Sequence, residues 1–158
     1  MIKHGANTRR DGPKALEDAS WHGNDDVIDA LLSSGVTSSS KVLGEDMNFA
    51  YDHPAAIKRL IAAGADLNAL STCGGGGTTI MSSAMNAYPD AVKILIDAGA
   101  DINARDDHGY TVLDLTIASS KATDLDHTPA QKQSLAQIIE MLRKSGAMES
   151  GLDVKWPE

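Results

Sequence analysis

The residue types that carry out most protein chemistry occur in this chain, but their spacing supports no catalytic or metal-binding site. The five histidines are His4, His22, His53, His108 and His127. No two of them have the His-x-His or His-Glu-x-x-His spacing that is typical of zinc ligands. Cys73 is the single cysteine, and no histidine lies near it in the sequence to act as its base. We therefore predict no metal, no cofactor and no enzymatic activity.

The glycine run at residues 74–77 and the paired aspartates are the remaining candidates for chemistry. A phosphate-binding loop would continue with Lys and then Ser or Thr, within a strand-loop-helix frame, and neither feature accompanies these glycines. Asp106 precedes Asp107, and Asp124 lies two residues before Asp126, but such pairs are typical of solvated turns. No EF-hand pattern surrounds them. We interpret the glycine run as a flexible loop and the aspartates as turn residues.

Length and charge narrow the possible functions. At 158 residues the chain has the size of one compact domain. Its net charge is −8, and residues 11–52 contribute two lysines against nine aspartates and glutamates, or −7. An acidic surface repels nucleic-acid phosphates and anionic lipids, so we expect neither nucleic acid nor membrane as a partner. A basic protein partner is the more favourable hypothesis.

The sequence also lacks the pattern of a membrane span or an export signal. A spanning helix needs about 18 consecutive apolar residues, and no such run is present. The basic residues near the start are not followed by the apolar segment of a secretory signal. We therefore expect a cytoplasmic protein.

Two segments of the chain are copies of one another. Residues 53–68 and 88–103 share the same pattern, and the second copy begins 35 residues after the first. Looser copies occupy residues 24–37 and 134–148, and a short piece of the pattern occupies 2–7. In each copy a glycine follows an apolar segment: Gly5, Gly35, Gly64, Gly99 and Gly146. The chain is therefore an array of repeated units.

The copy at 88–103 shows what one unit does physically. Its apolar residues have helical spacing and form one stripe: Ala91, Val92, Leu95 and Ile96. Gly99 ends this helix, because glycine readily adopts the left-handed conformation of a helix C-terminus. A shorter helix is predicted at about 80–86, and Pro89 suits the first turn of the second helix. Such a unit can bury its stripe only against neighbouring units.

These units resemble ankyrin repeats. The resemblance is strongest over residues 90–118, where residues 99–103 are similar to the end of one repeat, and Asp106, Gly109, Thr111 and Leu113 to the start of the next. It implies an all-α fold, an ankyrin-repeat solenoid of stacked helix-turn-helix units with short hairpin-like loops. The expected boundaries are an ankyrin-repeat domain at 1–147, with a stub at 2–7, repeats at about 9–37, 41–68, 77–103 and 109–147, an insertion at 119–133, and a C-terminal tail at 148–158.

Several segments depart from the family pattern. No copy contains an intact Thr-Pro-Leu-His motif, which removes the histidine that usually links repeats. The second copy lacks a clear start, so we expect an irregular first helix at 41–51. Thr128 has the features of an N-cap, with Pro129 in the first turn and Gln131 completing a capping box, so the last helix should start near residue 129. We expect the tail to pack back on that last unit through Leu152, Val154 and Trp156.

The resemblance also implies where a partner would bind. In such proteins the loop tips and the exposed side of each first helix form a concave binding face. Mapping the copies onto this pattern gives candidates at the loop tips, which are Arg10, Asp11, Asp107, His108 and Tyr110. The candidates on or after the first helices are Trp21, His22, Tyr51, Met85 and Asn86. Tryptophan and tyrosine are enriched at binding hot spots, although Trp21 or Tyr51 could instead pack between repeats.

Three functions are compatible with the sequence. The first is a protein-protein interaction module that binds another protein through its concave face, without catalysis and as a monomer when unbound. A sharper form of it is an immunity or inhibitor protein that neutralises a specific basic toxin or enzyme. The second is an enzyme, which would need a constellation of catalytic residues that the sequence does not display. The third is a scaffolding fragment of a larger ankyrin protein, a hypothesis prompted by a chain that begins inside the repeat pattern.

Overall fold

The computed structural model describes residues 8–36, 39–71, 76–122 and 127–155, and these segments contain eight α-helices and no strand. The helices in chain order are α1 (Thr8–Trp21), α2 (Asp25–Ser33), α3 (Ser40–Phe49), α4 (Pro54–Ala62), α5 (Thr79–Met85), α6 (Pro89–Asp97), α7 (Val112–Lys121) and α8 (Pro129–Lys144). They form four pairs, each consisting of a first and a second helix.

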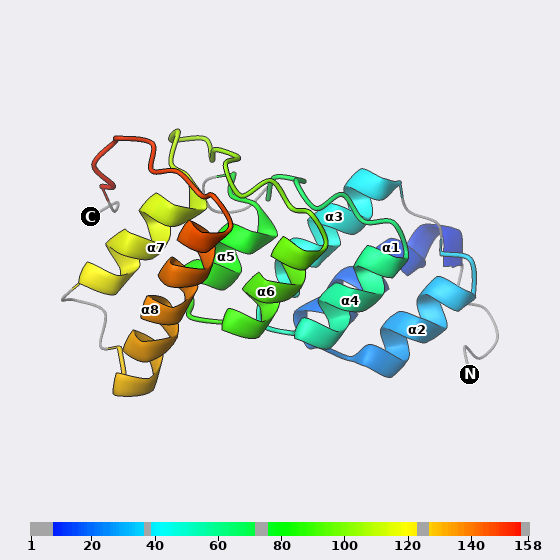
Figure 1. Ribbon diagram of the computed structural model, residues 1–158. Coiled ribbons are helices and arrows are strands. Elements are labelled where there is room, and N and C mark those ends of the chain that lie inside the picture. The colour runs from blue at the N-terminus through cyan, green and yellow to red at the C-terminus, as the bar shows by residue number, and fades with distance from the viewer. Residues whose placement is uncertain (1–7, 37–38, 72–75, 123–126, 156–158) are drawn as a thin grey trace.

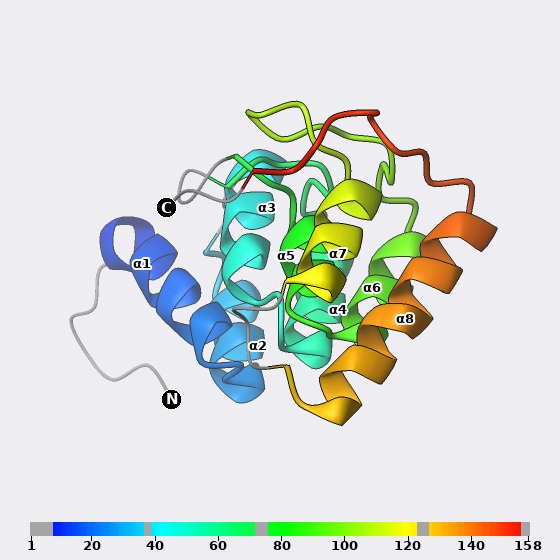
Figure 2. The ribbon, with the colours of Figure 1, turned by 90° about the vertical axis from the view of Figure 1, so that its left-hand side faces the viewer.

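The helices form two layers (Figures 1 and 2). The first helices α1, α3, α5 and α7 pack side by side in one layer, and the second helices α2, α4, α6 and α8 pack side by side in the other. The loops that lead from one pair to the next run along one edge of both layers. The expected all-α solenoid of stacked helix-turn-helix units is confirmed.

Local sequence signals set the ends of the second helices. Helices α4 and α6 each begin with proline, whose missing N–H has no helical partner in the first turn. Each is followed by a glycine with positive φ, Gly64 and Gly99, both at 89°. A side chain built on either glycine would meet no atom within 4 Å, so the backbone conformation alone requires glycine there.

A single hydrophobic core runs through all four pairs. Every second helix contributes buried aliphatic side chains, among them Ile28, Ile57, Leu60, Leu95, Ile138 and Leu142. The first helices supply Leu16, Met47, Ile80 and Leu113 to the same cluster. Burying one such side chain is worth roughly 1.5–3 kcal/mol, and the cluster is continuous from one pair to the next. The core therefore forms only when the helix pairs stack against one another.

Hydrogen bonds join consecutive pairs at both edges of the stack. On the edge away from the loops, a side chain of each later pair contacts a carbonyl at the end of the preceding first helix: His53 Nε2 lies 3.1 Å from Trp21 O, Ser83 Oγ 2.7 Å from Tyr51 O, and Ser119 Oγ 2.9 Å from Met85 O. On the loop edge, Asn68 Oδ1 accepts from Asp101 N at 2.8 Å. These bonds link consecutive pairs although no copy contains the histidine of the Thr-Pro-Leu-His motif.

The first helix of the second pair is regular, so the expectation of an irregular helix at 41–51 is wrong. Ser39 Oγ accepts from Val42 N at 3.3 Å and caps α3. A side chain on Gly44 would overlap the carbonyl oxygen of Asp66, so glycine lets α3 pack close to the loop that follows α4. The serine run that obscured the start of this repeat contains the cap itself.

The last pair follows the expected design and is covered by the tail. The Thr128–Gln131 capping box is present, and α8 begins at Pro129. Helix α7 extends into the expected insertion as far as Lys121, while residues 2–7 and Trp156 lie outside the described residues. The described part of the tail, residues 148–155, crosses the loop edge beside α7 (Figure 2).

Candidate functional site

The exposed side of the first helices is the surface on which the resemblance places a partner. Each helix within this row contacts its neighbours in the row and its own second helix, so its exposed side chains lie on the remaining side. We call this surface the first-helix face. It includes Asp18, Trp21, Glu45, Phe49 and Met85.

Trp21 is the most prominent side chain of this face. It is the last residue of α1, and 57% of its surface is exposed. Its ring lies 5.6 Å from the ring of Phe49 at the end of α3, with the planes tilted by 40°. Trp21 is thus supported by the next repeat on one side and open to solvent on the other. Phe49 was not among the predicted site residues, although it ends its first helix as Trp21 does.

The predicted residues His22, Met85 and Asn86 lie at the same ends of their first helices. His22 Nδ1 is 2.7 Å from the carbonyl oxygen of Asp18, and Asn86 Nδ2 donates to the carbonyl oxygen of Ser82 at 2.9 Å. Both exposed side chains therefore satisfy carbonyl groups at a helix C-terminus. Met85 is half-buried against the core.

Tyr51 lies in the turn between α3 and α4 and is half-buried. Its ring meets that of Tyr88, in the equivalent turn of the next pair, edge to face at 5.9 Å. Burial, followed by the neighbouring Asp52 and Tyr88, raises the pKa of Tyr51. The structure thus places Tyr51 between repeats and adds the exposed Tyr88, which sequence reasoning did not select.

The predicted loop-tip residues Asp107, His108 and Tyr110 share one turn. Asp106 Oδ1 accepts from the backbone N–H groups of His108 and Tyr110, both at 2.9 Å, and the rings of His108 and Tyr110 stack at 5.9 Å. The Tyr110 hydroxyl donates to Asp153 O and accepts from Lys155 N, both at 3.2 Å. The tail therefore occupies the polar end of Tyr110, while Asp107 and His108 remain exposed.

Arg10 and Asp11 were expected at a loop tip, and that placement is wrong. Both belong to α1, which is continuous from Thr8 to Trp21. Helix α1 begins five residues before Pro13, so the helix already includes the segment that was expected to form a loop tip. Asp11 is exposed, and the side chain of Arg10 lies outside the described residues.

A family comparison agrees with this geometry. Residues 60–115 match the family model for ankyrin repeats (many copies). Residues 60–115 are therefore ankyrin repeats, in agreement with the resemblance seen in the sequence. The matched segment runs from the end of α4 to the first half of α7 and includes the loop of Asp107, His108 and Tyr110. A search of curated proteins gave no match.

Ankyrin repeats are generally protein-protein interaction modules and are typically non-catalytic. Within the described residues, no three His, Cys, Asp or Glu side chains are placed to hold a metal ion. None of the helices described is long and apolar enough to cross a membrane.

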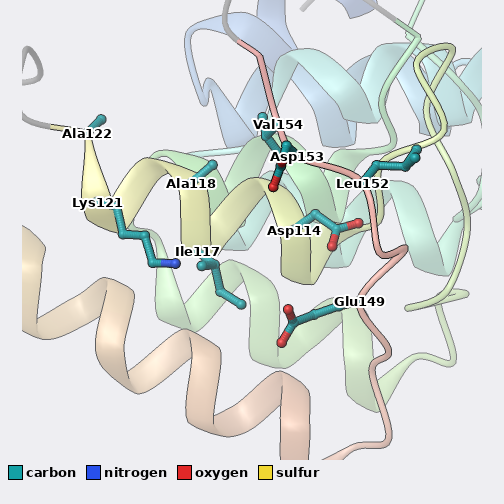
Figure 3. Close-up of a pocket in the computed structure, with 9 residues that line it drawn as sticks. All are labelled: Asp114, Ile117, Ala118, Lys121, Ala122, Glu149, Leu152, Asp153 and Val154. Carbon is teal, nitrogen blue, oxygen red and sulfur yellow. The ribbon is translucent and has the colours of Figure 1, made fainter.

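A cavity of about 340 Å³ lies at the far end of the ankyrin stack, between α7 and the tail (Figure 3). Two of its acidic lining residues are already engaged: Asp114 accepts from Ser150 N at 3.0 Å, and Glu149 pairs with Arg143 at 3.3 Å. Its apolar lining comes from Ile117, Leu152 and Val154. This is the side of α7 against which a further repeat would stack, and the tail covers part of it.

Two aspartates on first helices are buried, and their surroundings differ. Asp114 is 7% exposed and accepts from Thr111 N at 2.8 Å, from Thr111 Oγ1 at 2.9 Å and from Ser150 N. Burial alone would raise its pKa, but these hydrogen bonds outweigh burial and lower it.

Asp46 of α3 is 5% exposed, and its Oδ2 has no hydrogen-bond partner. Burial, then the carboxylates of Glu17 and Glu45, raise the pKa of Asp46 to about 7. The contact region between α1 and α3 is therefore acidic, and one of its buried carboxylate oxygens has no hydrogen-bond donor among the described residues.

Proposed function

We propose that this ankyrin array is a binding module that holds a partner protein against the first-helix face and the loop tips, and that it performs no catalysis. Trp21 carries the proposal. A tryptophan that is more than half exposed, yet fixed against Phe49, offers a large, ordered contact area to a partner. The exposed Asp107 and His108 extend the surface along the loop edge.

The architecture favours binding because the surface is ordered before the partner arrives. Side-chain to backbone bonds tie the first helices together, and Asp106 fixes the loop tip. Little conformational entropy is then lost on association. The partner would be held by complementarity to a rigid surface, and steric blocking is the simplest effect of such binding.

Charge supports a basic partner. The net charge is −8, and residues 11–52, which include α2, α3 and all but the first three residues of α1, contribute −7. Long-range attraction would then accelerate association. We expect the association rate to fall clearly as the salt concentration rises, because added ions screen exposed charges. A rate that does not depend on salt would contradict a basic partner. Inhibition of a basic toxin or enzyme is the sharper form of this proposal and rests on the same charge.

The same charge underlies three narrower proposals. We propose that the free protein is monomeric and cytoplasmic, and that it binds neither nucleic acid nor membrane. Light scattering of the purified chain tests the first of these, since a dimeric mass would contradict it.

The test compares two exposed apolar residues on opposite layers. Wild type, Trp21→Ala and Val27→Ala are used to capture proteins from a lysate of the source cells, and affinities for the recovered partner are then measured by calorimetry. Val27 is 39% exposed on α2, so it is a matched control on the other layer. We expect Trp21→Ala to weaken binding by about 2 kcal/mol, or roughly 30-fold, and Val27→Ala to have no effect. Loss of binding in Val27→Ala alone would contradict the proposal.

A further inference from the structure

The seam between α1 and α3 combines features that the rest of the first-helix face lacks. Glu17 comes from α1, and Glu45 and Asp46 come from α3. All three carboxyl groups are close enough for the first two to act electrostatically on Asp46. Glu17 and Glu45 are half-buried and reach solvent, whereas Asp46 is 5% exposed.

One oxygen of the buried Asp46 carboxylate lacks a hydrogen-bond donor within the described part of the fold. Lys14 pairs with Glu17 at 2.6 Å and lies 3.6 Å from Asp18, but no described residue donates to Asp46 Oδ2. A buried carboxylate without a donor is destabilising, because the lost hydration is not replaced. Asp114 is the contrasting case, because this buried aspartate accepts hydrogen bonds from Thr111 and Ser150 of the same chain. Its role is structural. Asp46 is a buried acceptor that lacks a donor.

The aromatic pair lies along the same seam. Trp21 follows Glu17 by four residues on α1, and Phe49 follows Glu45 by four residues on α3, so each aromatic side chain shares a helix face with a carboxylate. The contact between the two rings shows that these faces meet. Carboxylates and an exposed indole therefore lie side by side.

We propose that the seam between α1 and α3 receives an arginine side chain of the protein partner, whose guanidinium binds the carboxylates of Glu17, Glu45 and Asp46 and stacks against Trp21. Arginine fits because its planar group can donate to two carboxylates and stack on an aromatic ring at once, which the ammonium group of lysine does less well. This inference rests on the proposed binding function and names the chemistry of the contact. The −7 charge of residues 11–52 agrees with a basic occupant.

The experiment needs no identified partner. Isotope-labelled protein is titrated with N-acetyl-arginine amide and, separately, with N-acetyl-citrulline amide, which has a similar shape and no charge, and binding is followed by NMR. We expect saturable shifts of the Trp21 indole and of the amides of residues 17, 45 and 46 with the arginine probe. The citrulline probe should bind at least about tenfold more weakly, because the charge-assisted hydrogen bonds are absent.

Variants locate the site. Asp46→Asn and Glu45→Gln should each weaken arginine-amide binding several-fold, while Glu140→Gln, on the exposed side of α8, should leave it unchanged. N-acetyl-lysine amide is the third probe and should bind more weakly than the arginine probe. Equal binding of arginine and citrulline, lysine binding as tight as arginine, or shifts spread over all acidic residues, would each overturn the inference.

The outcome is separable from that of the proposed function. If the arginine probe fails while Trp21→Ala still abolishes partner capture, the seam inference falls and the binding module stands. If Trp21→Ala leaves partner capture unchanged while the arginine probe binds the seam, the assignment of the first-helix face as the partner surface falls.

Discussion

Two buried aspartates, one toward each end of the row of first helices, have pKa values shifted in opposite directions. At the α7 end, Asp114 is surrounded by donors from Thr111 and Ser150, and its pKa is lowered. At the α1 end, Asp46 has an unpaired oxygen and two carboxylate neighbours, and its pKa is raised to about 7. Both side chains are nearly excluded from solvent, and their pKa values differ because Asp114 accepts several hydrogen bonds while Asp46 is buried beside the carboxylates of Glu17 and Glu45. Asp114 is therefore satisfied within the fold, whereas Asp46 Oδ2 lacks, among the residues that the structure describes, the donor that we propose a partner supplies.

The largest expected effect comes from removing Asp114. Asp114→Ala leaves the backbone N–H groups of Thr111 and Ser150 without their acceptor and releases the tail from α7. We expect the free energy of unfolding at neutral pH to fall by about 4 kcal/mol, since hydrogen bonds to a charged group are worth about 1.5–3 kcal/mol each. Urea denaturation measures this loss. A change below about 1 kcal/mol would mean that the bonds to Asp114 contribute little to stability.

The contribution of Asp114 should also depend on pH. Because its folded pKa lies below the ordinary value of 3.8, its stabilising effect is present above that value and is lost as the pH falls through the folded pKa. The difference in stability between wild type and Asp114→Ala should therefore shrink only in strong acid.

Removing the charge of Asp46 should have the opposite sign. Its folded pKa is above the unfolded one, so the folded state binds more protons and wild-type stability falls as the pH rises from about 4 to about 7. We expect Asp46→Asn to stabilise the protein by about 3 kcal/mol at pH 8, and by little at pH 4. Urea denaturation of both proteins at the two pH values measures this. Equal effects at both pH values would show that the charge of Asp46 is not the cause.

The smallest of the three effects is expected from deleting the tail after Ala147. The deletion removes the Ser150 donor to Asp114 and both partners of the Tyr110 hydroxyl, but Thr111 still binds Asp114. We expect a loss of about 1–2 kcal/mol in the free energy of unfolding. Tyr110 should also become accessible, which iodination of its ring would detect. If stability and Tyr110 reactivity are both unchanged, the tail does not close this end in solution.

The sequence predicts the elements of this fold because their signals are local. Pro54 and Pro89 start second helices, and Gly64 and Gly99 follow their ends, as expected. The capping box of Thr128 is equally local and was also predicted. Each of these residues acts on backbone groups within a few positions of itself, so no knowledge of the tertiary structure is required.

The features of the candidate site depend on distant residues and were not predictable in the same way. Asp46 is perturbed by Glu17 from another helix, and Trp21 is supported by Phe49, 28 residues away in the sequence. Tyr110 was predicted to face a partner, but its hydroxyl is engaged by a tail more than 40 residues downstream. The type of residue was visible in the sequence, whereas its surroundings were not.

The most direct test of the contrast between the two ends is a carboxyl-carbon NMR titration of the free protein from about pH 2 to about pH 9, a range that spans both ordinary and shifted carboxyl values. The account predicts that Asp46 titrates near pH 7 and that Asp114 titrates below its ordinary value of 3.8. Titration of Asp46 and Asp114 together, near the ordinary value, would contradict the claim that Asp114 is satisfied within the fold and Asp46 is not.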